Sequence, residues 1–123
     1  MISIVDDDES VREATKGLVR SLGYTAATFA SGEEFLNSDR VNDTSCLITD
    51  VQMPGLTGLE LQSRLTAMDR RIPIIFVTAF PQEQVRARAL KAGAVGFLSK
   101  PFSDDSLIVC LDRALADSDG NGG

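Results

Sequence analysis

The sequence has no histidine, and its 123 residues include only two cysteines. Without histidine, the chain offers no His-based catalytic triad, no His metal ligand and no histidine phosphoacceptor of its own. Cys46 and Cys110 lie in apolar segments far apart in the sequence, which favours buried thiols in a reducing compartment. Carboxylates, hydroxyls and amines must therefore supply the chemistry of any site.

Long apolar runs and an excess of positive charge are also missing. No run reaches the roughly 18 apolar residues of a transmembrane helix. The segment from Met1 to Val5 leads directly into acidic residues and lacks the pattern of a signal peptide, so we expect a cytoplasmic protein. The formal charge of −6 disfavours direct binding to nucleic acid or to an anionic membrane, although solubility alone explains an acidic surface equally well.

The length and composition are typical of one globular domain. Apolar residues make up 43% of the chain and charged residues 24%. We expect this domain over residues 1–116. The polar, glycine-rich residues 117–123 are interpreted as a flexible tail or as the start of a linker to an effector domain.

Short apolar runs alternate with amphipathic segments along the chain. The patterns predict strands at residues 2–5, 24–29, 45–49, 73–78 and 95–98, and helices at residues 9–22, 31–36, 57–68, 82–91 and 103–115. Capping boxes at Ser31–Glu34 and Thr57–Glu60 mark two helix starts. Five strand–helix repeats with apolar strands predict an α/β fold, a three-layer doubly wound (βα)5 sandwich around a parallel five-stranded sheet.

Polar residues gather where the predicted strands end. Asp6 and Asp7 follow the first strand, Asp50 the third, Thr78 ends the fourth and Lys100 follows the fifth. Ligands of open parallel sheets bind beyond the carboxyl ends of the strands, so these side chains are expected to meet. Taken alone, each of these residues is explained as an ordinary turn, cap, strand or surface residue. Their occurrence together, each at or just after the end of a predicted strand, indicates a functional site.

Three neighbouring carboxylates repel one another unless a cation lies among them. A site of oxygen ligands without Cys or His suits Mg²⁺ better than Zn²⁺. Asp8, the next acid along, is interpreted instead as a turn residue or helix cap. In phosphoryl transfer, Asp50 can act as the nucleophile, while the cation, Lys100 and Thr78 neutralise the phosphoryl oxygens.

These segments resemble the receiver domains of two-component response regulators. The resemblance covers residues 2 to about 116 and is carried by residues 4–7, 47–55, 77–79 and 100–102. Residues 31–36 and 93–97 resemble FixJ-type receivers in particular. The resemblance implies a CheY-like fold with strand order 2-1-3-4-5. It also implies a signalling phosphoacceptor rather than an enzyme in the usual sense, with intrinsic autophosphorylation and autodephosphorylation.

The resemblance implies a metal site and a phosphoacceptor. Asp50 would accept the phosphoryl group. Asp7 would bind Mg²⁺, or Mn²⁺ as a substitute, directly, and Asp6 largely through water. Asp50 and the backbone carbonyl of Gln52 would supply further ligands.

The resemblance also implies a switch. Thr78 and Lys100 would contact the phosphoryl oxygens, and Phe97 would turn inward as Thr78 moves; an ordinary core phenylalanine is the alternative. Phe80 and Pro81 depart from the polar residues frequent in this family. A bulky Phe80 would shield the acyl phosphate from water, and Pro81 would stiffen the entry to the fourth helix.

The partner implied by the resemblance is a histidine kinase or a phosphotransfer protein. The resemblance also implies that this domain passes on its phosphorylation state through the face of the fourth helix, fifth strand and fifth helix. That face would control homodimerisation or an effector, with transcription regulation as the output. A solvated helix face without such a role is the alternative. This face includes Arg86, Arg88, Leu90, Lys91, Ala94 and parts of residues 103–114.

Two other functions remain open from the residues alone. An Asp-nucleophile phosphatase usually carries a second Asp two residues after the first, where this chain has Gln52. A flavodoxin-like cofactor-binding domain needs a phosphate loop after the first strand, where Asp6, Asp7 and Asp8 would repel phosphate.

Overall fold

The computed structural model describes residues 1–122, with side chains over residues 1–116, and five strands alternate there with five α-helices. The strands are β1 (Ile2–Val5), β2 (Ala26–Phe29), β3 (Cys46–Asp50), β4 (Ile74–Thr78) and β5 (Gly96–Ser99). The helices are α1 (Glu9–Ser21), α2 (Gly32–Leu36), α3 (Gly58–Ala67), α4 (Glu83–Lys91) and α5 (Asp104–Gly122), with a short 3₁₀ helix η1 (Asp39–Asp43) before β3.

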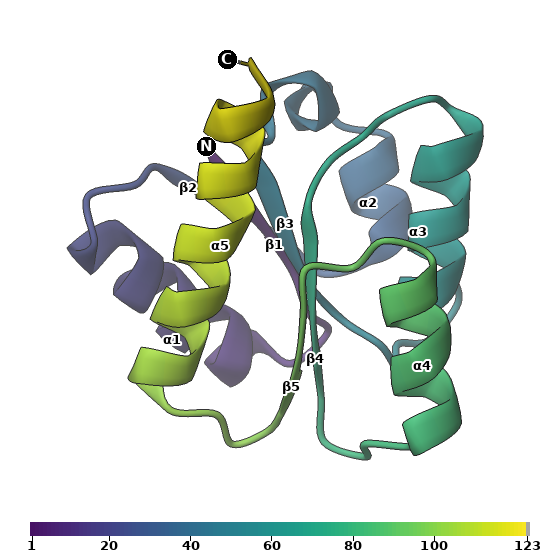
Figure 1. Cartoon of the computed structure of the whole chain (residues 1–123). Helices are drawn as coiled ribbons and strands as arrows, with labels where there is room; N and C mark the ends of the chain where they lie inside the picture. The colour runs from purple at the N-terminus through teal and green to yellow at the C-terminus, as the bar shows by residue number, and fades with distance from the viewer. Residues whose placement is uncertain (123) are drawn as a thin grey trace.

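The five strands form one parallel sheet in the order β2-β1-β3-β4-β5. Helices α1 and α5 cover one face of the sheet, and α2, α3 and α4 cover the other (Figure 1). The predicted fold and strand order are therefore confirmed. The register pairs Val5 with Thr49, so the residues that follow, Asp6 and Asp50, lie level with each other at one edge.

The sheet separates two hydrophobic cores because alternate strand residues face opposite sides. Ile4, Ile48 and Ile75 pack with α1 and α5, whereas Leu47 and Phe76 pack with α2, α3 and α4. Burying one such large side chain contributes about 1.5–3 kcal/mol. These cores hold the strands in register and so fix the backbone at the sheet edge where the polar residues lie.

Both cysteines are buried and unpaired, as predicted. Cys46 and Cys110 belong to the core between the sheet and the α1–α5 layer. Burial, together with the neighbouring Cys110, raises the pKa of the Cys46 thiol to about 12, which keeps it protonated at neutral pH.

Side chains cap the helices where the sequence predicts it. Asp8 Oδ1 accepts a 3.2 Å hydrogen bond from the backbone N–H three residues later, confirming that Asp8 caps α1. Thr57 and Glu60 form both hydrogen bonds of the predicted capping box on α3. Ser31 accepts a 3.1 Å bond from the N–H of Glu34, which is one half of the predicted box on α2.

Some element boundaries differ from those predicted. Strand β2 begins at Ala26 rather than residue 24, and η1 has no counterpart among the predicted elements. The backbone of α5 continues to Gly122, past the expected domain boundary at residue 116. The flexible tail or linker over residues 117–123 stays a prediction, because Gly123 and the side chains from residue 117 onward lie outside the described residues. Among the described helices, none has the length and apolar character needed to cross a membrane.

Candidate functional site

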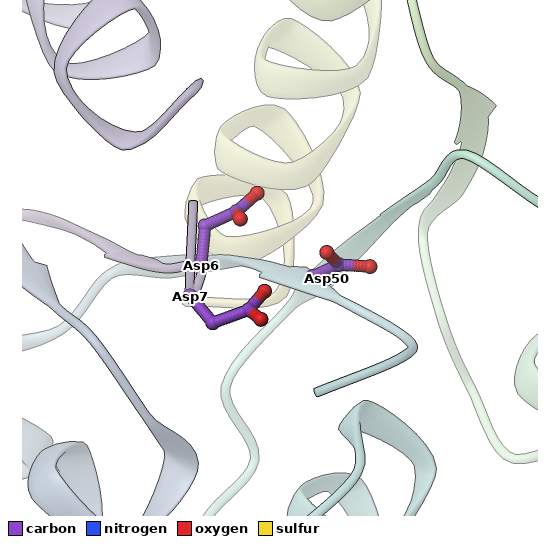
Figure 2. A group of neighbouring side chains, drawn as sticks. All are labelled: Asp6, Asp7 and Asp50. Carbon is purple, nitrogen blue, oxygen red and sulfur yellow. The ribbon is translucent and has the colours of Figure 1, made fainter. Parts of the chain in front are cut away.

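Three carboxylates meet at the carboxyl-terminal edge of the sheet. Asp6 and Asp7 follow β1, Asp50 ends β3, and one oxygen from each lies within 4.8 Å of the others (Figure 2). Asp6 and Asp50 are buried, whereas Asp7 is exposed. The structure therefore brings together the three acids that the sequence places at strand ends.

Lys100 joins this cluster from the loop after β5. Its Nζ donates hydrogen bonds of 2.9 Å to Asp6 Oδ2 and 2.9 Å to Asp50 Oδ2. One ammonium group thus bridges both buried carboxylates, and three formal negative charges face one positive charge. This surplus of negative charge favours binding of a further cation.

Burial and pairing act in opposite directions on the titration of the site. Burial raises the pKa of Asp50 above its usual range, and the hydrogen bond and charge of Lys100 only partly offset this rise. Burial alone would lower the pKa of Lys100, but its hydrogen bonds to Asp6 and Asp50 outweigh that effect and the pKa of Lys100 is raised. Lys100 therefore stays charged at neutral pH.

The three carboxylates fit a hard divalent cation such as Mg²⁺. Every ligand atom that Asp6, Asp7 and Asp50 offer is an oxygen, and their separation of at most 4.8 Å lets one ion touch more than one of them. The exposed carboxylate of Asp7 gives the cluster an open side through which an ion and its waters can enter. This donor set suits an ion that keeps some of its waters.

Backbone groups of Gln52 and Thr78 form hydrogen bonds with residues of the cluster. The N–H of Gln52 donates a 3.1 Å bond to Asp50 Oδ1. The buried Thr78 ends β4, and its carbonyl accepts a 2.7 Å bond from the N–H of Lys100. Thr78 Oγ1 accepts a 3.1 Å bond from the N–H of Phe80. The metal-ligand role of the Gln52 carbonyl and the phosphoryl contact of Thr78 remain predictions.

The two phenylalanines of the predicted switch region differ in burial. Phe97 on β5 is half-buried against the core, with its ring centroid 6.4 Å from that of Phe76. The side chain of Phe80 is 67% exposed. Shielding of an acyl phosphate by Phe80 remains a prediction.

A glycine allows α3 to begin directly beneath Asp50. The N–H of Gly58 donates a 2.8 Å bond to the carbonyl of Val51. A Cβ atom at Gly58 would lie 2.4 Å from the carbonyl oxygen of Asp50, which is closer than real Cβ contacts allow. The missing side chain at Gly58 thus lets the helix hold the backbone that carries Asp50.

Two side chains contact the site loops without being predicted from the sequence. Arg12 Nη1 donates a 2.7 Å bond to the carbonyl of Asp6. Glu33 Oε2 accepts a 3.3 Å bond from the N–H of Leu56 in the β3–α3 loop. An arginine one turn into the helix that follows an acidic loop is a weak sequence signal for the first contact. The sequence carries no signal for the second.

Comparison with known proteins relates the chain to bacterial signalling proteins. Residues 2–112 match the family described as the response regulator receiver domain. Nodulation protein W of Bradyrhizobium diazoefficiens is 44% identical over 116 residues, covering 94% of this chain and 50% of that protein. Transcriptional regulatory protein FixJ of the same organism is 35% identical over 114 residues, covering 93% of this chain and 56% of that protein.

Solved structures show the same relationship. The low-resolution structure of response regulator StyR superposes with a TM-score of 0.90 at 41% identity, covering 98% of this chain and 61% of that chain. The chain thus spans about half the length of the curated relatives that it matches. The comparisons favour the signalling interpretation over the phosphatase and flavodoxin-like alternatives.

Proposed function

This chain belongs to the family of response regulator receiver domains, and from that premise we propose that it accepts a phosphoryl group on Asp50. The proposed donor is a histidine kinase or a phosphotransfer protein, the kind of partner with which receiver domains interact. The observation that carries the proposal is the double contact of Lys100, whose Nζ lies 2.9 Å from both Asp6 and Asp50, beside the exposed carboxylate of Asp7.

In the proposed reaction, a carboxylate oxygen of Asp50 forms a bond to the phosphorus atom. The phosphorus–nitrogen bond to the donor's histidine breaks, and its electron pair leaves with the imidazole nitrogen. Lys100, held beside Asp50 by a 2.9 Å hydrogen bond, is placed to neutralise charge on a phosphoryl oxygen. Its second bond, to Asp6, keeps the ammonium group in place before the donor arrives.

The carboxylates of Asp6, Asp7 and Asp50 would hold Mg²⁺, or Mn²⁺ as a substitute, together with the carbonyl of Gln52. Asp7 would be a direct ligand, and Asp6 would act largely through water. When bound, the ion supplies positive charge to the phosphoryl oxygens. Slow hydrolysis of the acyl phosphate by water would return Asp50 to its carboxylate form.

The proposed output begins at Thr78. Its hydroxyl leaves the N–H of Phe80, contacts a phosphoryl oxygen, and the half-buried Phe97 turns further inward. The change alters the α4–β5–α5 face, which includes the exposed Arg86 and controls homodimerisation or an effector. Arg88, which the sequence pattern assigned to this face, instead lines a groove with the α3 residues Glu60 and Arg64. Transcription regulation in the cytoplasm is the proposed consequence, as the name of the relative FixJ suggests for that protein.

The test is phosphorylation by acetyl phosphate, a small phosphoryl donor that needs no kinase. Wild-type protein with Mg²⁺ is expected to gain one phosphoryl group, seen by intact mass, that hydroxylamine removes. Asp50→Asn protein and wild-type protein with excess chelator are expected to gain none. Label that persists in Asp50→Asn, or that forms equally with chelator, contradicts the proposal.

The proposed output has a separate test. Light scattering before and after addition of beryllofluoride reports whether occupation of Asp50 changes the mass in solution. A doubling of mass that Arg86→Glu abolishes supports dimerisation through the α4–β5–α5 face. An unchanged mass removes homodimerisation as the output and leaves control of an effector.

A further inference from the structure

Arg12 connects the first helix to the backbone of the acidic loop. Its Nη1 donates a 2.7 Å hydrogen bond to the carbonyl oxygen of Asp6. Its backbone N–H donates a 2.9 Å bond to the carbonyl of Asp8. One residue in the first turn of α1 therefore binds two carbonyls of the loop that supplies the acids.

Every polar atom of Asp6 has a partner in the structure. Its N–H donates to the carbonyl of Phe29 at 3.1 Å, and its carboxylate oxygens accept from the N–H of Asp8 and from Lys100 at 2.9 Å each. Among these contacts, the bond from Arg12 is the one that reaches the carbonyl. The loss of Arg12 would thus leave three contacts to hold the Asp6 side chain and N–H, but would release its carbonyl.

The carbonyl of Asp6 belongs to the peptide plane that carries Asp7. Because a peptide unit is planar, fixing the oxygen of Asp6 also fixes the N–H and Cα of Asp7. The side chain of Asp7 is exposed and so receives little steric support from packing. Its carboxylate nevertheless lies within 4.8 Å of those of Asp6 and Asp50. The backbone is therefore the main means of aiming Asp7 at the other two acids.

We propose that Arg12 is a positioning residue for the divalent cation: by binding the Asp6 carbonyl it fixes the peptide plane from which Asp7 projects toward Asp50. This inference rests on the proposed function, because it concerns the affinity of the same cation site. Arg12 touches neither the cation nor the phosphoryl group. Its effect is on the dissociation constant for Mg²⁺ rather than on the rate of transfer once the site is filled.

Binding of Mg²⁺ alone, measured by calorimetry and by amide NMR shifts, separates these effects. Arg12→Met keeps an apolar stem of similar length but loses the hydrogen bond and the charge. We expect it to bind Mg²⁺ roughly five- to tenfold more weakly, the scale of one net hydrogen bond. Arg12→Lys retains a donor and the charge and is expected to stay within about twofold of wild type on the same scale. Labelling by acetyl phosphate at saturating Mg²⁺ should be close to wild type in both variants.

Arg20→Met is the matched control. Arg20 lies in the last turn of the same helix, is exposed, and its loss changes the net charge by the same amount. Loss of a positive charge by itself reduces repulsion of Mg²⁺ and favours its binding. Unchanged or slightly tighter Mg²⁺ binding in Arg20→Met, with weakened binding in Arg12→Met, therefore supports positioning. Equal weakening in both variants overturns it.

Thermal unfolding without Mg²⁺ tests a merely structural role. If Arg12→Met lowers the melting temperature but binds Mg²⁺ as tightly as wild type, the positioning role is wrong. If Arg12→Met does not fold, Arg12→Lys and Arg12→Gln decide: weaker binding by Gln than by Lys supports the proposal, and equal wild-type affinity of both overturns it. Absence of Mg²⁺ binding by the wild type would instead contradict the proposed function itself.

Discussion

The ammonium group of Lys100 lies 2.9 Å from the carboxylate of Asp50, although 50 residues separate them in the sequence. The contact exists because β3 and β5 both run toward the same edge of the sheet, with β4 between them. It places a fixed positive charge beside the proposed phosphoacceptor before any donor binds. Catalysis by charge of this kind depends on groups that need no rearrangement during the reaction.

Replacement of Lys100 by methionine should slow phosphorylation far more than it affects binding of the cation. Loss of one preorganised donor of this kind lowers rates by roughly 100- to 1,000-fold. The rate of labelling by acetyl phosphate at saturating Mg²⁺ measures the effect. Lys16→Met is the control, since Lys16 makes only a partly exposed ion pair of 4.0 Å with Glu13 on α1. Equal rates for Lys100→Met and Lys16→Met would remove Lys100 from the mechanism.

Mg²⁺ should stabilise the folded protein through the carboxylate of Asp7. A ligand that binds only the folded state raises the free energy of unfolding by about 2.7 kcal/mol at about 100 times its dissociation constant. Urea unfolding with Mg²⁺ and with chelator measures this increase for wild type. We expect Asp7→Asn to lose most of it.

Asp8→Asn is the neighbouring control for that measurement. Asp8 Oδ1 caps α1, and asparagine retains an oxygen that can do the same. The Asp8→Asn protein should therefore keep the stabilisation by Mg²⁺. If Asp8→Asn loses it and Asp7→Asn keeps it, the assignment of the two acids is reversed.

The sequence predicts the meeting of the site residues better than it predicts their contacts. The backbone of a parallel sheet brings Asp6, Asp50 and Thr78 to one edge independently of their side-chain conformations. The order of strands and the hydrophobic pattern are therefore enough to predict that these residues meet. The bridging of two carboxylates by Lys100 depends on the path of the β5–α5 loop and on one rotamer. Strand periodicity carries no information on either.

Contacts between loops could not be predicted from the sequence either, because they too depend on loop paths that hydrophobic periodicity does not encode. The bond between Glu33 and the N–H of Leu56 joins residues 23 apart, on a helix start and an irregular loop. Helix η1 begins after the cap residue Ser38 and has five residues, so it is too short to show a periodic hydrophobic pattern in the sequence. Local patterns report burial and helix starts, whereas these features depend on where the chain returns in space.

Asp50→Asn should be more stable than wild type at neutral pH without Mg²⁺. Burial raises the pKa of Asp50 above its usual 3.8, so the ionised form is disfavoured in the folded state. The folded protein therefore gains stability from Asp50 below the unfolded pKa, and that gain is lost as pH rises through the folded pKa. Relative to Asp50→Asn, wild type should lose stability as pH rises from about 4 toward neutrality.

Urea unfolding of both proteins across this pH range, with chelator present, measures the difference. It should shrink toward acidic pH, where the carboxyl of wild-type Asp50 is protonated. A difference that stays constant with pH, or a less stable Asp50→Asn at neutral pH, would show that Lys100 compensates for burial more fully than the raised pKa indicates.

Gly58→Ala and Gly17→Ala should have opposite effects on stability. A Cβ at Gly58 would lie 2.4 Å from the Asp50 carbonyl oxygen and 3.0 Å from Val51 Cα, both rigid backbone atoms. Overpacking of this kind costs about 1–3 kcal/mol. Gly17 lies inside α1 with nothing within 4 Å of the added Cβ, so alanine there should stabilise the protein by up to about 1 kcal/mol.

The two glycine variants should also differ at the site. Relief of the clash at Gly58 must move either the start of α3 or the backbone of Asp50, and with it the carboxylate that Lys100 binds. Gly58→Ala should therefore weaken Mg²⁺ binding and slow labelling by acetyl phosphate, whereas Gly17→Ala should change neither. If Gly58→Ala is destabilised but binds Mg²⁺ and accepts the phosphoryl group at wild-type levels, then α3 yields and the Asp50 backbone is held by the sheet alone, through its pairing with β4.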